Sequence, residues 1–231
     1  KLTSREIDEA ASRVPARDLS VLKGMIRNVV SYHRGQKMPK RAFRKKGLVV
    51  EEAPVPVESV MVYVPGGTAS YPSSLIMGVV PAQIAGVRRS CAATPGRGGA
   101  INGHVAAAAK LLGIGEIYRV GGAQAVYAFA FGTGSVPKVD MIVGPGNAYG
   151  EEAKREVYGS VGIDMLAGPT ELVILCTRAH SPEHVALDMF SQAEHDELAS
   201  VGLFSSSREH LEAVVRTMEG LLAAAPRRET I

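Results

Sequence analysis

Short glycine-rich turns that follow apolar runs constrain the fold of this 231-residue chain more than any other feature of its sequence. The apolar runs at residues 60–64, 117–120 and 141–143 each end at such a turn, and a helix-like segment follows each turn. A short apolar run bounded by glycine is typical of a buried strand. Because such runs alternate with helical segments, the sequence predicts an α/β fold with a mainly parallel sheet.

The glycine-rich turns are candidate walls of a ligand site, because ligands of parallel sheets bind beyond the carboxyl ends of the strands. Glycine lets backbone amides approach a ligand, and a helix N-terminus favours phosphate. Tight strand-to-helix turns also use glycine for geometry alone. Neither the G-x-G-x-x-G fingerprint after a strand nor a P-loop is present. The turns read PGGT (65–68), GGAQ (121–124), GPGN (144–147) and AGPTE (167–171).

Helical and strand patterns mark further elements. Thr3 and Glu6 form a capping-box pattern, and residues 3–36 are predicted to be helical with one apolar stripe. Residues 48–57 alternate weakly and contain two prolines, which favours an edge strand or an extended connector. Helices are also expected over residues 75–86, 103–112 and 148–158, and strands over residues 90–94, 172–175 and 201–204.

The composition excludes some classes of partner. Aromatic residues are scarce and tryptophan is missing, so platforms that stack nucleic-acid bases are not expected. The basic run at residues 37–46 is interpreted as a solvated loop. No apolar run reaches the ~18 residues of a membrane span, and no signal-peptide pattern is present. Cys91 and Cys176 are predicted to be buried thiols of a cytoplasmic protein.

The segment 181–196 carries the clearest metal-binding pattern. Ser181-Pro-Glu183 predicts a helix start with a hydroxyl cap, proline in the first turn and an early carboxylate. Gln192 and His195 stand three residues apart, so both project from one face of the helix. An amide oxygen and an imidazole so placed can share a metal ion. On spacing alone, a histidine near a helix end is more often a capping or surface residue.

Taken together, these motifs resemble the histidinol dehydrogenase family, in the family's order and with similar spacing between about residues 60 and 203. The resemblance is carried by several motifs in register, which makes a chance match implausible. The matching segments are Tyr63-Val-Pro-Gly-Gly-Thr68, Gly121-Gly-Ala-Gln-Ala125, Val143-Gly-Pro-Gly-Asn-Ala-Tyr149, Ala153-Lys-Arg155, Gly162-Ile-Asp-Met165, Ala167-Gly-Pro-Thr-Glu171 and Ser191-Gln-Ala-Glu-His-Asp196.

The resemblance implies a reaction and its cofactors: oxidation of L-histidinol through the aldehyde to L-histidine, with zinc and two NAD used in turn. NAD would be contacted by Tyr63, Gln124 and Asn147, which match the tyrosine, glutamine and asparagine of the family's YVPGG, GGAQA and GPGN motifs. Zinc would grip the small amino alcohol substrate and leave its carbinol carbon open to hydride transfer.

The same resemblance implies where substrate and metal bind. Gln192 and His195 match two zinc ligands of the family's SQAEH motif, and both would also contact the substrate. Thr170 stands where the family's AGPSE motif has a substrate-contacting serine, so the hydroxyl is kept and a methyl group is added. The remaining zinc ligands, an aspartate and a histidine, are expected beyond Ile231.

The family's fold implies an organisation in domains. Its members have two incomplete Rossmann-like domains, one inserted in the other, and form an intertwined homodimer. Residues 63–171 would be the NAD-binding domain. Residues 1–62 and 172–231 would belong to the second domain, which carries half of the zinc site.

The family's catalytic acid/base is a glutamate-histidine pair several dozen residues after the SQAEH motif, so the pair is expected beyond Ile231. Two similar stretches, Glu183-His184 and Glu209-His210, are interpreted as surface residues at helix starts. The chain is therefore expected to be a fragment of a longer enzyme, which the lack of an N-terminal methionine favours, or a shortened relative.

Two alternatives stay open. The threonine at position 170 is compatible with a relative that oxidises another small polar alcohol, such as a sulfonated diol, with the same zinc and NAD. A truncated, non-catalytic module for nucleotide binding or dimerisation is the other alternative, although it would have no need of the pair Gln192 and His195. A nucleic-acid role for residues 37–46 has no recognisable motif behind it.

Overall fold

Five parallel strands organise the first part of the chain in the computed structural model, which describes residues 1–66, 71–96, 100–167, 170–178, 180–194, 197–225 and 228–231. Their order is β5-β4-β3-β6-β7, and every neighbouring pair is parallel. The predicted α/β class with a parallel sheet is confirmed. The strands are β3 (Ser59–Tyr63), β4 (Arg89–Ala93), β5 (Ile117–Tyr118), β6 (Met141–Val143) and β7 (Gly162–Ile163).

The order of these strands contains a reversal. The chain passes from β3 to β4 to β5 in one direction and then returns to place β6 on the other side of β3. The reversal between β3 and β6 is a topological switch point, where neighbouring connections leave toward opposite faces of the sheet. Ligands of open α/β sheets bind in the crevice at such a point.

Helices cover both faces of the sheet, and the sheet separates two apolar cores. Alternate residues of β3 divide between them: Val62 lies in the core with α3 (Pro72–Ala85) and α4 (Gly103–Leu111), whereas Met61 lies in the core with α5 (Gly122–Phe131) and α6 (Ala148–Val157). This alternation is the period of two that a strand imposes on its side chains. Burial on both faces explains why the strands of this sheet are continuous apolar runs.

The N-terminal helical region is two helices, α1 (Ser4–Ala11) and α2 (Ala16–Arg34), rather than one segment over residues 3–36. The break falls just before Pro15, because proline disfavours the helical conformation of the residue that precedes it. The predicted capping box is confirmed: Glu6 donates its backbone N–H to Thr3 Oγ1 (3.2 Å), and the Glu6 carboxylate accepts from the Thr3 backbone (2.7 Å).

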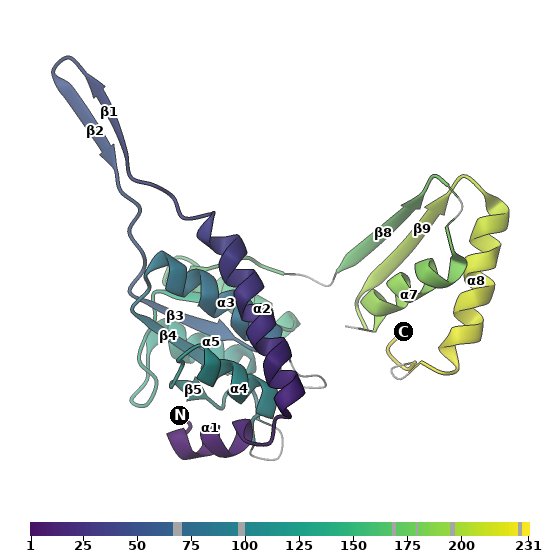
Figure 1. The fold of residues 1–231 in the computed structure, drawn as a ribbon, viewed down its shortest axis with the longest axis horizontal. Coiled ribbons are helices and arrows are strands. Elements are labelled where there is room, and N and C mark those ends of the chain that lie inside the picture. Colours follow the sequence, from purple (N-terminus) through teal and green to yellow (C-terminus); the bar gives the residue numbers. More distant parts are fainter. Residues whose placement is uncertain (67–70, 97–99, 168–169, 179, 195–196, 226–227) are drawn as a thin grey trace. The chain divides into compact units, whose positions relative to one another are not determined.

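A two-stranded antiparallel hairpin, β1 (Arg41–Lys45) and β2 (Leu48–Glu52), extends from this part of the chain (Figure 1). Every residue of both strands is exposed, so the basic run is solvated as predicted, but it forms a strand rather than a loop. The prediction for residues 48–57 was right in type for β2 only, because β2 ends two residues before Pro54.

The second part of the chain contains a separate α/β unit. Strands β8 (Glu171–Cys176) and β9 (Ser200–Ser205) pair in parallel, and α7 (Pro182–Ala193) connects them. A small core forms between these strands, α7 and α8 (Arg208–Leu222). The predicted helix after Ser181 is present with proline in its first turn, but the Ser181 side chain makes no cap hydrogen bond within the described residues.

Contacts divide the chain into the units Lys1–Leu166 and Ala167–Ile231. Within the first unit, α1 packs on α4, and α2 packs on α3 and α4. The predicted grouping of residues 1–62 with 172–231 in one domain stays a prediction. Among the described residues, no helix combines the length and the apolar character that crossing a bilayer requires.

Candidate functional site

The described parts of the glycine-rich turns of the first unit meet at one edge of its sheet, and Gly67 and Thr68 of the PGGT turn lie outside the described residues. Because β3 to β7 are all parallel, the turns that follow them lie at the same, carboxyl edge. Backbone hydrogen bonds tie neighbouring turns together there: Val64 donates to Ala93 O (2.8 Å), and Thr94 donates to Tyr118 O (3.0 Å). This edge, at the switch point between β3 and β6, is the candidate site.

Tyr63 joins two of the predicted cofactor motifs. It ends β3, its side chain is buried among the residues of α5 and α6, and its hydroxyl accepts a hydrogen bond from the Gly122 backbone N–H at 2.9 Å. Gly122 opens α5 with a φ of 64°, in the left-handed region that glycine adopts without strain. Tyr63 is only 6% exposed, so most of its side chain is a packing group.

Gly144 brings the end of β6 against the end of β3. Its φ is 112°, and a Cβ at this position would lie 2.3 Å from the Tyr63 carbonyl oxygen. Both the dihedral angle and the close approach require glycine. The backbone of the GPGN turn therefore packs directly against the end of β3, at the switch point.

Gln124 and Asn147 stand at the starts of the two helices that leave this edge. Asn147 is the N-cap of α6, and its Oδ1 accepts a hydrogen bond from the Gly150 N–H at 3.0 Å. Gln124 lies in the first turn of α5, and both side chains are exposed. Two amide side chains at helix starts can hydrogen-bond the polar groups of a nucleotide.

The GPGN turn is not an open phosphate cradle, contrary to one expectation for the glycine turns. Its amides already have side-chain acceptors: Gly144 donates to Asp164 Oδ2 (2.7 Å) and Gly146 to Glu151 Oε1 (2.9 Å). Two carboxylates at the turn also repel an anion. Asn147 is the exposed side chain of this turn whose amide nitrogen has no part in the helix cap, and its role toward NAD stays a prediction.

Sequence reasoning missed the charged residues behind this turn, Glu151, Lys154 and Asp164. Glu151 and Lys154 are buried, with Lys154 only 2% exposed, whereas Asp164 is exposed. Lys154 and Asp164 lie in segments that match the family, Ala153–Arg155 and Gly162–Met165, but no role followed from the match. The spacing of Glu151 and Lys154, three residues apart on a helix, was the available signal.

The predicted substrate and zinc residues belong to the second unit. Thr170 is exposed immediately before β8, and its carbonyl oxygen accepts from the Ser200 N–H at 3.0 Å. Gln192 is half-buried in the last turn of α7, and His195 lies outside the described residues. In the described part of the chain, no group of three histidine, cysteine or acidic side chains is placed to hold a metal ion. An amide oxygen and an imidazole fit zinc chemically, but two ligands do not complete a zinc site.

One of the two acid/base-like stretches departs from its prediction. Glu183 and His184 are exposed in the first turn of α7, as expected. His210 is buried (6% exposed) in the first turn of α8, where its backbone N–H donates to Ser207 Oγ at 3.2 Å. It is a core residue of the second unit, because α8 turns this face toward the sheet.

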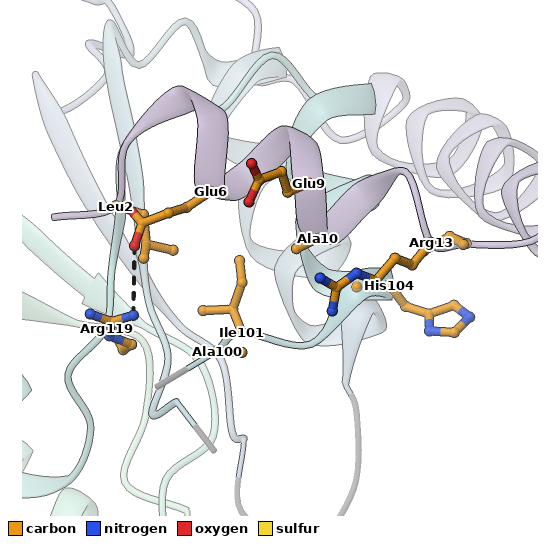
Figure 2. A pocket seen from close by; sticks show the side chains of 11 residues that line it. Leu2, Glu6, Glu9, Ala10, Arg13, Ala100, Ile101, His104 and Arg119 are labelled. Atoms are coloured by element: carbon orange, nitrogen blue, oxygen red, sulfur yellow. Dashed lines mark ion pairs between the residues drawn. The ribbon is translucent and has the colours of Figure 1, made fainter. Parts of the chain in front are cut away.

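A cavity of about 320 Å³ lies away from these residues, between α1 and the start of α4 (Figure 2). Two of its charged side chains form pairs within the protein: Arg119 lies 3.7 Å from Glu6, and His104 lies 2.9 Å from Asp18. None of the predicted site residues lines it. The cavity therefore adds nothing to the candidate site.

The two cysteines are buried, as predicted. Burial raises the pKa of the Cys91 thiol to about 12. A thiol with so high a pKa carries almost no thiolate at neutral pH and is a poor nucleophile. Cys91 is a packing residue.

Comparisons with known proteins identify the family of the chain. A family model described as histidinol dehydrogenase matches residues 1–231. The histidinol dehydrogenase of Bacillus cereus is 47% identical over 232 residues, which cover 99% of this chain and 54% of the relative, and that of Listeria innocua is 48% identical over 212 residues, covering 90% and 49%. The chain thus spans about half the length of the curated relatives it matches.

Solved structures give the same result. The crystal structure of histidinol dehydrogenase from Elizabethkingia anophelis superposes with a TM-score of 0.92 at 34% identity, covering 99% of this chain and 54% of that one. An acetylating aldehyde dehydrogenase from Geobacillus thermoglucosidasius reaches a TM-score of 0.56 at 15% identity, covering 94% and 48%. The second match shows a shared fold alone.

Proposed function

The chain belongs to the histidinol dehydrogenase family, and on that premise we propose that it serves the NAD- and zinc-dependent oxidation of L-histidinol to L-histidine, in histidine biosynthesis. One observation carries the cofactor part of the proposal. The GPGN turn is packed on the end of β3 at the switch point, with Tyr63, Gln124 and Asn147 on turns of the same sheet edge. Open α/β sheets bind nucleotides at this place.

The overall reaction balances as two successive two-electron oxidations. In the first stage the alcohol would lose a hydride and a proton to give histidinaldehyde. In the second stage water would add to the aldehyde, and the hydrate would lose a second hydride and become the carboxylate. NAD, held by Tyr63, Gln124 and Asn147, would supply the hydride acceptor in both stages. Two NADH and three protons are formed for one water consumed.

The residues of this chain bind and orient in this scheme. The Tyr63 hydroxyl accepts from Gly122, so its own proton is directed away from that amide and can be donated to the cofactor. The side-chain amides of Gln124 and Asn147 would hydrogen-bond NAD, and the hydroxyl of Thr170 would hydrogen-bond the substrate. Gln192 and His195 would hold zinc, which polarises the bound alcohol. Homodimer formation in the cytoplasm belongs to the same proposal.

The test is NADH formation from L-histidinol by the 231-residue chain and by a chain extended to the length of the relatives. We expect turnover by the extended chain, loss of turnover after dialysis against a chelator, and recovery with zinc. Inactivity of the extended chain with histidinol, together with normal NADH binding, would contradict the substrate assignment.

Thr170 favours a second candidate, oxidation of another small polar alcohol such as a sulfonated diol. The added methyl group of threonine leaves less space for a substrate than the family's serine does. If the methyl group of Thr170 selects against histidinol, Thr170→Ser in the extended chain should lower the KM for histidinol. An unchanged preference for histidinol in both forms would remove this candidate.

A further inference from the structure

A buried lysine holds the GPGN turn from behind. Lys154, on α6, has its Nζ 2.6 Å from the Gly144 carbonyl oxygen and 2.9 Å from Asp164 Oδ1. The Met165 carbonyl oxygen at 3.3 Å and Glu151 Oε1 at 3.4 Å complete its surroundings. Four oxygens around one ammonium group satisfy its three donors.

The two carboxylates extend this contact to the amides of the turn. Asp164 accepts from Gly144 through Oδ2 and from Met165 (2.8 Å) through Oδ1. Glu151 accepts from Gly146 through Oε1. Side chains therefore hold both the N–H and the C=O of Gly144, and also the N–H of Gly146, where the strand pairing of β6 has ended.

Such a network costs free energy that an apolar contact would not. Taking the Lys154 ammonium group and the Glu151 carboxylate out of water is unfavourable, and the hydrogen bonds and ion pairs of Lys154 only offset that cost. What the network contributes is a fixed backbone geometry, because Gly144 has no side chain of its own and adopts a φ of 112°. The ion network fixes a backbone conformation that glycine alone leaves free.

Asn147 depends directly on this conformation. It follows Gly146 and caps α6, the helix that also carries Glu151 and Lys154. The turn is thus anchored at Gly144 by Lys154, at Gly146 by Glu151 and at Asn147 by the Gly150 N–H. A shift of Gly144 would move the Asn147 amide relative to Tyr63.

We propose that Lys154 is a positioning residue for the cofactor: with Asp164 and Glu151 it fixes the Gly144–Gly146 backbone and so places the Asn147 amide to bind the nucleotide. This inference rests on the proposed function for its ligand, NAD. The network itself contacts no ligand. Its effect is on affinity for the cofactor, since a misplaced side chain binds less well even where the fold is intact.

The test compares Lys154→Met with Lys110→Met, which removes a surface lysine that pairs with Asp8 at 2.6 Å. Amide hydrogen exchange of residues 144–147 reports the turn, exchange of β3 and β6 reports the sheet, and fluorescence titration with NADH gives Kd. For Lys154→Met we expect exchange in the turn to accelerate with the sheet still protected, and Kd to rise about 10- to 100-fold. Lys110→Met should change neither quantity.

Two further variants keep the test decisive. Lys154→Arg restores the cation and should recover part of both the protection and the affinity. Asp164→Asn, at an exposed position, should loosen the turn in the same direction if Lys154→Met does not fold.

Three results would overturn the proposal. A loosened turn with unchanged Kd would show that the turn does not place the cofactor group. Equal loss of protection in the turn and the sheet would show a merely structural lysine. If the unaltered chain bound no NADH, the proposed cofactor would fail by itself, and the exchange data would still show whether Lys154 fixes the turn.

Discussion

The hydroxyl of Tyr63 and the backbone N–H of Gly122 lie 2.9 Å apart, which joins the end of β3 to the start of α5 although β5 and not β3 precedes that helix. This hydrogen bond holds together two turns that come from distant parts of the sequence. It also satisfies one of the N–H groups that the first turn of any helix leaves without an intrahelical partner.

Replacing Tyr63 by phenylalanine should therefore weaken the first unit locally. The ring and its packing are kept, but the Gly122 N–H loses its acceptor, at a cost of about 1 kcal/mol in the free energy of unfolding. Urea denaturation measures the loss, and Tyr158→Phe, at a residue 70% exposed, is the control. Equal stability of the two variants would mean that the bond contributes nothing.

Gly144→Ala should be among the most destabilising single substitutions in the first unit. The left-handed backbone costs about 1–2 kcal/mol for alanine, and the 2.3 Å approach to the Tyr63 carbonyl oxygen adds a steric clash. Gly134→Ala is the matched control, because a Cβ there meets nothing within 4 Å. Thermal melting of both variants checks this, and a Gly144→Ala protein as stable as the control would contradict the close packing.

Glu116 should give the first unit a measurable acid sensitivity. The hydrogen bond from Arg89 (3.0 Å) lowers the pKa of the Glu116 carboxyl below its ordinary value. Since the folded pKa lies below the unfolded one, the pair stabilises the protein above the unfolded pKa, and this stabilisation is lost as pH falls through the folded pKa. Glu116→Gln should thus cost up to about 1 kcal/mol at pH 7, after allowance for solvent screening, and almost nothing once the pH is below the folded pKa of Glu116.

Denaturation of Glu116→Gln and of the unaltered chain at several pH values measures this difference. The exposed pair of Arg5 and Glu9 provides a control through Glu9→Gln, which should have a smaller effect at every pH. A difference that grew on acidification would show that the sign is wrong.

His210→Leu should leave the second unit as stable as before or make it more stable by about 1 kcal/mol. The Nε2 atom of His210 is buried and has no hydrogen-bond partner within the described residues, so its removal relieves a desolvated polar group. Ser207→Ala is the contrasting variant, because it removes the cap of α8 and should cost about 1 kcal/mol. A large loss in His210→Leu would mean that the imidazole has a partner in the folded protein.

The main-chain pattern of the first unit was predictable because its strands are buried on both faces. Residues such as Val62 and Ile142 form continuous apolar runs, and the glycines that follow them mark the turns. Of the exposed hairpin only β2 was expected as a strand, from its weak alternation, whereas β1 lies in the basic run and shows no apolar periodicity. Local sequence also gives no sign that His210 is buried, since its burial depends on how α8 packs against β9.

The candidate site was predictable only in part. The predicted cofactor residues Gln124 and Asn147 belong to turns that can be read from the sequence, and both side chains are exposed. Lys154 and Asp164 could not be assigned, because their partners are backbone groups of a turn ten or more residues away. Contacts of this kind arise from tertiary structure and leave no periodic signal.

The basic run at residues 37–46 bears on how copies of this chain approach each other, because part of it forms a strand of the exposed hairpin. In the described chain β1 pairs with β2 alone, so the outer edge of each strand presents unpaired backbone groups that another protein molecule could extend into a larger sheet. Arg41, Arg44 and Lys45 place positive charge along β1, whereas Glu51 and Glu52 lie on β2. Two molecules that approach with their β1 edges therefore repel each other, which disfavours growth of a larger sheet through that edge.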